Sequence, residues 1–190
     1  MKAKALLLVA VAVIAWGLKR HYSDARPDDL SWILAPTARL VSIVTGAPFE
    51  RQPGEGYVSR DRLFLIEKSC AGINFMIAAF GMLAFTLRHR AGTAMSAASV
   101  LGVSLTASYS AAVVVNAVRI AIAMWLAAHS VELSAFSAAD VHRLEGITVY
   151  FGGLVLLHAL ACRLEQRTTA AVQGSGTVGS WELGIGSSGS

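Results

Sequence analysis

The feature that most constrains this chain is an apolar stretch from Ala91 to Val131, in which Arg119 is the only formally charged residue. As a single α-helix, a stretch of this length would extend about 60 Å, which is twice the ~30 Å thickness of a hydrocarbon core. The stretch therefore predicts a membrane protein, and we expect its helix to be interrupted. Gly102 and the polar cluster Ser108-Tyr109-Ser110 are the expected break points.

The composition of the whole chain agrees with a membrane location. Of its 190 residues 55% are hydrophobic, and the mean hydropathy of +0.57 is too high for a typical soluble domain. The net charge of +4 is dispersed and has no basic run interleaved with aromatic residues, which argues against a nucleic-acid partner. The cysteines and histidines lack the spacing of metal ligands, so we expect no metal and no cofactor.

Three further segments are expected to form membrane-spanning helices. Ala5 to Leu18 is a short apolar run with no cleavage site after it, so we interpret it as an uncleaved first span. Ala71 to Leu87 has no charged residue, and Ser137-Ala138-Ala139-Asp140 resembles a capping box that starts a helix running to about Cys162. Together with the first half of the long stretch, they predict an all-α polytopic bundle with about four full spans and partly inserted outer-face helices.

The orientation follows from the basic loop Arg88-His89-Arg90, which belongs on the cytoplasmic side. If the second half of the 91–131 stretch crossed back, His142 would lie in the cytoplasm and the last span would end outside. If that half instead folds along or partly into the outer leaflet, the basic end of the last span is cytoplasmic. We expect this second arrangement, with both termini inside and Cys70, Arg119 and His142 near the periplasmic face of the cytoplasmic membrane.

The segments that do not span are expected to be of three kinds. His21 to Ser69 is a polar outer-face connection that holds all four prolines. Within it, Leu30 to Thr45 is expected to form an interfacial or re-entrant helix, and Tyr57 to Ile66 a short extended segment. Residues 1–166 form the predicted membrane domain, and 167–190 a disordered Gly/Ser-rich tail.

Cys70 stands at the start of the 71–87 run, with Ser69 before it as a plausible helix N-cap. The N–H groups at a helix start stabilise negative charge, which suits a nucleophilic thiol. The alternative is that Cys70 is one more small apolar residue of the bundle. A disulfide with Cys162 is not expected, because the two residues fall at opposite ends of parallel spans.

Arg119 is the second candidate, because an arginine inside an apolar stretch costs several kcal/mol unless it reaches water, a partner or a functional cavity. Asn116, one turn earlier on the same face, could hold its guanidinium in position. The alternative is a structural arginine that reaches the lipid head groups or tethers two helices.

His142 is the only one of the five histidines expected both near the outer face and close to the start of a span. Glu145 follows on the same helical face. Three glycines of this helix permit close helix approach: Gly146, Gly152 and Gly153. A lone histidine can equally be structural.

A thiol, an imidazole and a guanidinium at one membrane face supply the nucleophile, the acid/base and the oxyanion stabiliser of acyl transfer through a thioester. Three elements resemble the exosortase/archaeosortase family in order and spacing: Cys70-Ala71-Gly72-Ile73, Asn116-Ala117-Val118-Arg119 and His142. The resemblance covers roughly Phe64 to Cys162, and the short length is most similar to exosortase K. The family commonly has Ser after its cysteine, where this chain has Ala71.

The resemblance implies a membrane cysteine protease or transpeptidase that cleaves the C-terminal sorting signal of exported proteins. Such a signal consists of a short motif, a transmembrane helix and a basic cluster. Cys70 would attack the scissile carbonyl, Arg119 would stabilise the oxyanion and His142 would transfer the protons, with Asn116, Glu145 and Gly72 as supporting residues. Two other functions stay open: a small transporter or channel, and a non-catalytic membrane assembly factor.

Overall fold

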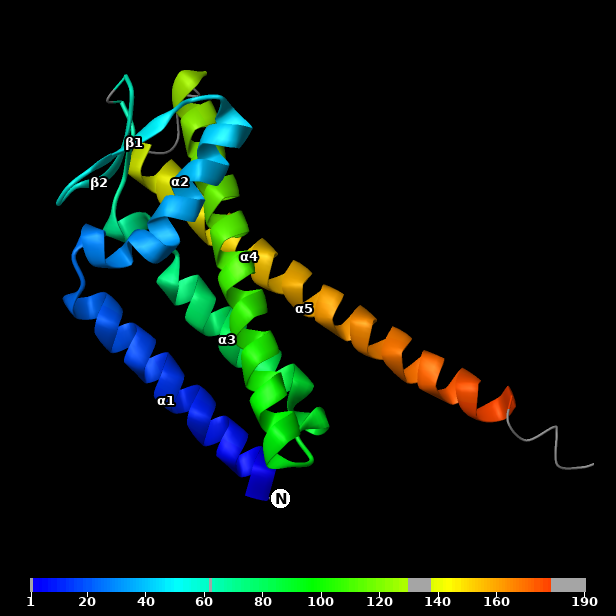
Figure 1. Cartoon of the computed structure of the whole chain (residues 1–190). Helices are drawn as coiled ribbons and strands as arrows, with labels where there is room; N and C mark the ends of the chain where they lie inside the picture. Colours follow the sequence, from blue (N-terminus) through cyan, green and yellow to red (C-terminus); the bar gives the residue numbers. More distant parts are fainter. Residues whose placement is uncertain (1, 62, 130–137, 179–190) are drawn as a thin grey trace, which may run out of the picture.

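The protein is described here from a computed structural model that covers residues 2–61, 63–129 and 138–178, without the side chains of 138–143 and 168–178. These residues are mostly helical (Figure 1). The α-helices are α1 (Lys2–Asp24), α2 (Ser31–Thr45), α3 (Ile73–Leu87), α4 (Ala94–Ala128) and α5 (Ala138–Val178). Short 3-10 helices are η1 (Pro27–Leu30), η2 (Lys68–Cys70) and η3 (Arg88–Arg90), and the strands are β1 (Phe49–Gln52), β2 (Gly56–Ser59) and β3 (Leu65–Ile66).

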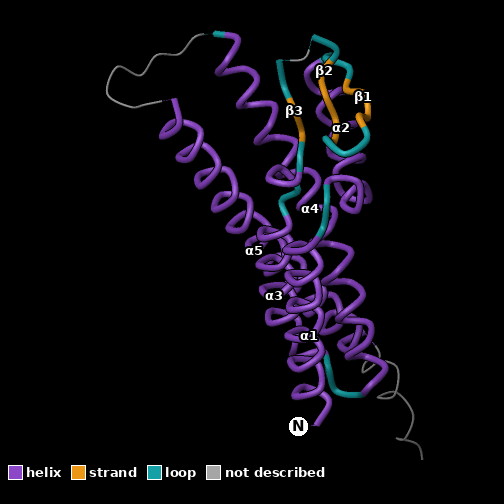
Figure 2. The backbone as a smooth tube through the Cα atoms, turned by 90° about the vertical axis from the view of Figure 1, so that its left-hand side faces the viewer, coloured by secondary structure: helices purple, strands orange, loops and turns teal. Residues whose placement is uncertain are grey.

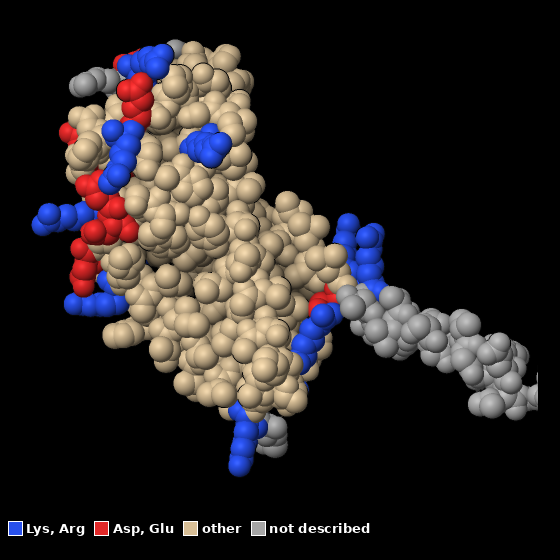
Figure 3. Space-filling model, in the orientation of Figure 1, with Lys and Arg blue, Asp and Glu red and all other residues tan. Residues whose placement is uncertain are grey.

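Three helical segments in the described residues are long and apolar enough to cross a membrane: Lys68–Arg90, Ala94–Ala128 and Leu144–Arg167. The prediction of a mostly helical fold with helices able to span a membrane is thereby confirmed, whereas the count of four full spans is not. The first expected span lies in α1, which is not among the three and runs beside α3 and α4 (Figure 1). Figure 3 shows a broad uncharged band between the charged side chains at the two ends of the visible face.

The three helices alternate in direction. The rings of Phe75 and Tyr150 lie 5.6 Å apart near the start of α3, and Glu165 pairs with Arg90 at 2.8 Å just after α3 ends. α5 therefore runs parallel to α3, and α4 runs in the opposite direction and packs against both. Both cysteines are free thiols, as expected. α5 continues to Val178, past its predicted end; the disordered tail remains a prediction for 179–190, which lie outside the described residues.

α4 is one unbroken helix, so the expected interruption is wrong. The hydroxyls of Ser108 and Ser110 donate to carbonyls of their own helix, those of Leu105 at 2.9 Å and Thr106 at 3.0 Å, and the polar cluster therefore needs no break. At 35 residues, α4 is about 52 Å long. Its second half does not return across the bundle but extends past the start of α3, where α2 packs along it (Figure 1).

A proline in α2 leaves one backbone carbonyl of this helix available for a hydrogen bond from α4. Pro36 lies inside α2 and has no N–H to donate to the carbonyl of Trp32, one turn earlier. That carbonyl instead accepts a hydrogen bond of 2.8 Å from the Tyr109 hydroxyl, and the Trp32 and Tyr109 rings stack at 5.9 Å. The predicted helix at 30–45 is confirmed. It is anchored to α4 through the Trp32 carbonyl, which Pro36 leaves without a donor in its own helix.

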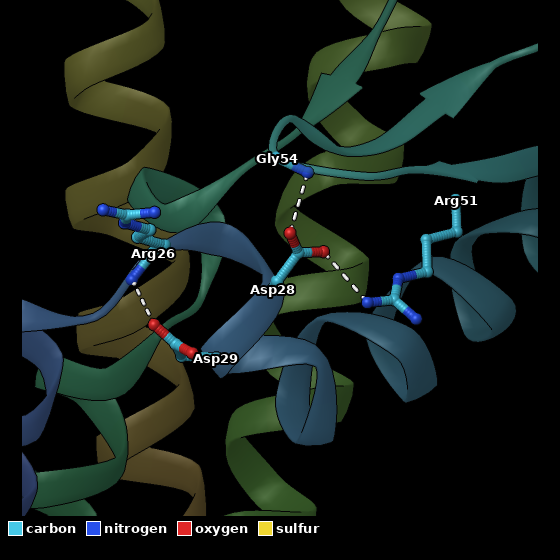
Figure 4. A network of polar contacts seen from close by, with 5 residues as sticks. All are labelled: Arg26, Asp28, Asp29, Arg51 and Gly54. Atoms are coloured by element: carbon cyan, nitrogen blue, oxygen red, sulfur yellow. Dashed lines mark hydrogen bonds and ion pairs between the residues drawn. The ribbon is translucent and has the colours of Figure 1, made fainter.

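A small antiparallel sheet in the order β1-β2-β3 stands beside α2, so the all-α class is wrong in this respect. The extended segment predicted at 57–66 contributes β2 and β3. Asp28 of η1 anchors the β1–β2 hairpin by accepting hydrogen bonds from Arg51 at 2.9 Å and from the Gly54 N–H at 2.8 Å (Figure 4). These two bonds, that of Arg51 first, hold the pKa of Asp28 below its ordinary value.

The main core lies between α2, α3 and α4, and its members are buried apolar side chains. They include Ile33, Leu34 and Val41 of α2, Ile73, Phe75, Met76 and Ala79 of α3, and Ala112, Ala117 and Ile120 of α4. Cys70 is partly buried and packs against this core. Within this core α4 packs against both α2 and α3, and α3 also packs against α1.

Candidate functional site

Cys70 is the last residue of η2, immediately before the turn into α3. The N-cap of α3 is Gly72, with a left-handed φ of 65° that favours glycine, so the expected N-cap role of Ser69 in this helix is wrong. The Ser69 hydroxyl instead donates to Glu67 at 2.9 Å. A Cβ at Gly72 would lie 3.4 Å from the side chain of Asn116. Gly72 thus lets the chain turn tightly against α4.

Cys70 and Arg119 line the same cavity, which has a volume of about 350 Å³. Its remaining wall comes from the segment before Cys70 and from one turn of α4, through Phe64, Leu65, Ile66, Glu67, Ser69, Ile120 and Ala123. Two of the three predicted catalytic residues, from distant parts of the chain, therefore line one largely apolar cavity beside the start of α3.

A chain of hydrogen bonds links Arg119 to the backbone of Cys70. Nη1 of Arg119 donates to the Tyr150 hydroxyl at 3.2 Å, and that hydroxyl donates to Oδ1 of Asn116 at 2.9 Å. Nδ2 of Asn116, a fully buried residue, donates to the carbonyl oxygen of Cys70. The prediction that Asn116 positions Arg119 is thereby refined, because the described link between them runs through Tyr150.

Sequence reasoning missed Tyr150. Its signal was a phenol inside an apolar helix, because a buried tyrosine hydroxyl requires a hydrogen-bond partner. Tyr150 also lies four residues after Gly146, on the same face of α5. That face is the one turned to Arg119, whose guanidinium carbon lies 5.4 Å from the centre of the Tyr150 ring.

α5 approaches Arg119 through a carboxylate and a glycine. Both carboxylate oxygens of Glu145 are buried, and Glu145 interacts electrostatically with Arg119. A Cβ at Gly146 would lie 3.2 Å from Nε of Arg119, and one at Gly153 would lie 3.0 Å from Val115. The predicted close helix approach is therefore confirmed at Gly146 and Gly153, whereas a Cβ at Gly152 would have no atom within 4 Å.

His142 lies in the first turns of α5, less than one turn before Glu145, but its side chain lies outside the described residues. Its catalytic role therefore stays a prediction. Within the described part of the chain, no group of three or more His, Cys, Asp or Glu side chains could hold a metal ion.

The cavity combines a thiol, which can act as a nucleophile, with a guanidinium, which can bind an oxyanion. Arginine stays charged when desolvated, and its planar donors suit an oxyanion. Comparisons of this chain with protein-family models, with curated proteins and with solved structures find no match.

Proposed function

We propose that this protein is a membrane-embedded cysteine peptidase or transpeptidase of the exosortase type. The observation that carries the proposal is the cavity shared by Cys70 and Arg119, together with the hydrogen bonds through Asn116 and Tyr150 that connect the two residues. A purely structural arginine would need a partner, but it would not need to share a cavity with the thiol that the family resemblance names.

The proposed reaction is acyl transfer in two steps. The Cys70 thiol gives its proton to His142 as its sulfur attacks the scissile carbonyl carbon, and the carbonyl oxygen takes up the negative charge beside Arg119. As the C–N bond breaks, His142 protonates the leaving amine and a thioester remains. His142 then takes a proton from water or an acceptor amine, which attacks the thioester and releases the Cys70 thiol.

The proposed substrates are exported proteins with a C-terminal motif, a transmembrane helix and a basic cluster, as the family resemblance implies. The end of the bundle that carries Cys70 is proposed to lie at the periplasmic face of the cytoplasmic membrane, because the basic turn Arg88–Arg90 is at the other end of α3. α1 is proposed as a fourth span. Its apolar side chains Leu6, Val9, Val13 and Trp16 are exposed along the bundle, as lipid-facing residues would be.

The test is to trap the thioester on Cys70. The wild-type chain is expressed together with candidate tail-anchored exported proteins, and covalent adducts are sought that hydroxylamine releases. We expect such an adduct on the wild type and on Cys162→Ala, which removes the other free thiol, and none on Cys70→Ala. His142→Ala should slow the formation and turnover of the adduct.

Two results would favour a different function. If Cys70→Ala reaches wild-type membrane abundance and still supports processing of the exported proteins, the protein acts as an assembly factor. If solute uptake changes in Cys70→Ala vesicles while no adduct forms on any variant, the protein acts as a transporter. Either result contradicts the proposed enzyme.

A further inference from the structure

β3 is an edge strand at the cavity of Cys70. The sheet order is β1-β2-β3, so β3 pairs with β2 on one side only among the described residues. Figure 2 shows β3 between β2 and the upper turns of α4. The cavity occupies this place, because its lining combines residues 64–67 with Arg119, Ile120 and Ala123 of α4.

The hydrogen bonds of Phe64, the residue directly before β3, show which backbone groups of β3 point toward the cavity. The N–H of Phe64 donates to the Ser59 hydroxyl at 2.9 Å, and its carbonyl accepts from the Ser59 N–H at 2.9 Å. Both groups of Phe64 therefore point toward β2. The Ile66 carbonyl also does so, because a Cβ at Gly56 would clash with it.

Successive residues of a strand direct their backbone groups to opposite sides. Leu65 lies between Phe64 and Ile66, and it faces Val58 in the register of β2 and β3. Its N–H and C=O must therefore point away from β2, to the open edge of the sheet. Leu65 as a whole residue is 44% exposed, as expected for a strand with an uncovered edge.

We infer that the open edge of β3 binds the substrate as an extended peptide, which adds a fourth strand to the sheet and leads the scissile bond to Cys70. This inference rests on the proposed function and names the binding mode of that site. An exposed strand edge is a template for another extended backbone, whose N–H and C=O pair with it at alternate residues. A helical segment has no such groups to offer, because its own hydrogen bonds use them.

The walls of the cavity fit this occupant. Leu65 lies five residues before Cys70, so a strand paired with Leu65 runs along the wall that ends at the thiol. The opposite wall is apolar at Ile120 and Ala123 and has a positive charge at Arg119. An apolar side chain of the peptide packs against the first two residues, while a carbonyl of its backbone faces the third.

The test measures how fast peptide reagents alkylate Cys70 in the Cys162→Ala protein, reconstituted in lipid vesicles. The probe is a mixture of acetylated tetrapeptide chloromethyl ketones randomised at each position, in which the thiol displaces chloride to form a C–S bond. Iodoacetamide measures the reactivity of the thiol without a peptide. A mixture with N-methylated backbone amides cannot form strand hydrogen bonds, and it serves as the second control.

We expect the peptide mixture to alkylate Cys70 about tenfold faster than its N-methylated counterpart, since a tenfold change corresponds to about one or two hydrogen bonds. Leu65→Pro deletes the outward N–H without removing a bond to β2, and it should abolish this preference. Leu65→Ala keeps the N–H and should retain it. The rate with iodoacetamide should be the same in the Cys162→Ala protein and in the two Leu65 variants made from it. Equal rates would show that the site is folded in all three.

The inference is overturned if the N-methylated and unmodified mixtures react equally with the wild-type edge, or if Leu65→Pro and Leu65→Ala behave alike. A failure of the proposed function looks different. In that case no hydroxylamine-sensitive adduct forms on Cys70 with exported proteins, whatever the rates of the chloromethyl ketones.

Discussion

The hydroxyl of Tyr150 on α5 donates a hydrogen bond of 2.9 Å to the Asn116 side chain on α4, and the same hydroxyl accepts one of 3.2 Å from Arg119. Asn116 in turn donates to the backbone carbonyl of Cys70. One phenol therefore orients both the guanidinium and the amide that holds the thiol-bearing turn.

Tyr150→Phe should lower the rate of thioester formation by roughly tenfold to a hundredfold, because a buried hydrogen-bond group left unsatisfied costs about 1–3 kcal/mol. Tyr109→Phe is the matched control, since it removes a tyrosine hydroxyl bonded to Trp32, away from Cys70. The measurement is adduct formation normalised to membrane abundance. Equal losses in the two variants would mean that Tyr150 acts on stability alone.

Arg119→Lys should lose activity by about 10²–10³, although the formal charge is kept. The ammonium of lysine is a point charge without the planar donor pair of a guanidinium, and the loss of one oxyanion donor has an effect of about this size. The exposed Arg39 of α2 provides the control variant Arg39→Lys. Near-normal processing by Arg119→Lys would assign Arg119 a structural role.

Gly146→Ala should reduce activity without reducing stability. Alanine favours the helix over glycine by about 1 kcal/mol, but its Cβ would lie 3.2 Å from Nε of Arg119 and would displace the guanidinium. Gly152→Ala gains the same helix propensity where no atom lies within 4 Å. Thermal stability and adduct formation are measured for both, and a loss of activity in Gly152→Ala as well would contradict this explanation.

The anchor of the β1–β2 hairpin should depend on pH. Arg51 and the Gly54 N–H hold the pKa of Asp28 below its unfolded value, so the anchor is present above the ordinary value of about 3.9 and is lost as pH falls through the lowered pKa. Hydrogen exchange of residues 49–59, corrected for the intrinsic rate, should rise in that acid range. Asp28→Asn should show the faster exchange already at neutral pH. Glu55→Gln, which also removes a carboxylate but lies in the β1–β2 turn itself, should behave as the wild type.

The proposed orientation predicts opposite accessibility for the two thiols. A membrane-impermeant maleimide added from the periplasmic side should label Cys70 in the Cys162→Ala protein, and it should not label Cys162 in the Cys70→Ala protein. The same reagent should label a cysteine at position 142 in His142→Cys with both native cysteines removed. Labelling of Cys162 but not Cys70 from that side would reverse the proposed orientation.

Much of this arrangement follows from local sequence. Hydropathy identified α3, α4 and α5 because each must satisfy its backbone hydrogen bonds within itself while it exposes apolar side chains. The absence of charge between Ala71 and Leu87 placed Cys70 at the start of a helix. The cost of burying a charge identified Arg119 as a candidate functional residue. The helix of α2 was also predictable, although the consequence of Pro36 was not.

Only the tertiary structure decided how these parts meet. The length of α4 suggested a break, but a helix longer than a bilayer remains whole when α2 covers its exposed half and its serines bond within the helix. Tyr150 could not be assigned to the site from its own surroundings in sequence, because its two partners lie on another helix and are more than thirty residues away. The open edge of β3 borders a cavity whose far wall is α4, and a wall from a distant part of the chain cannot be predicted from the strand itself.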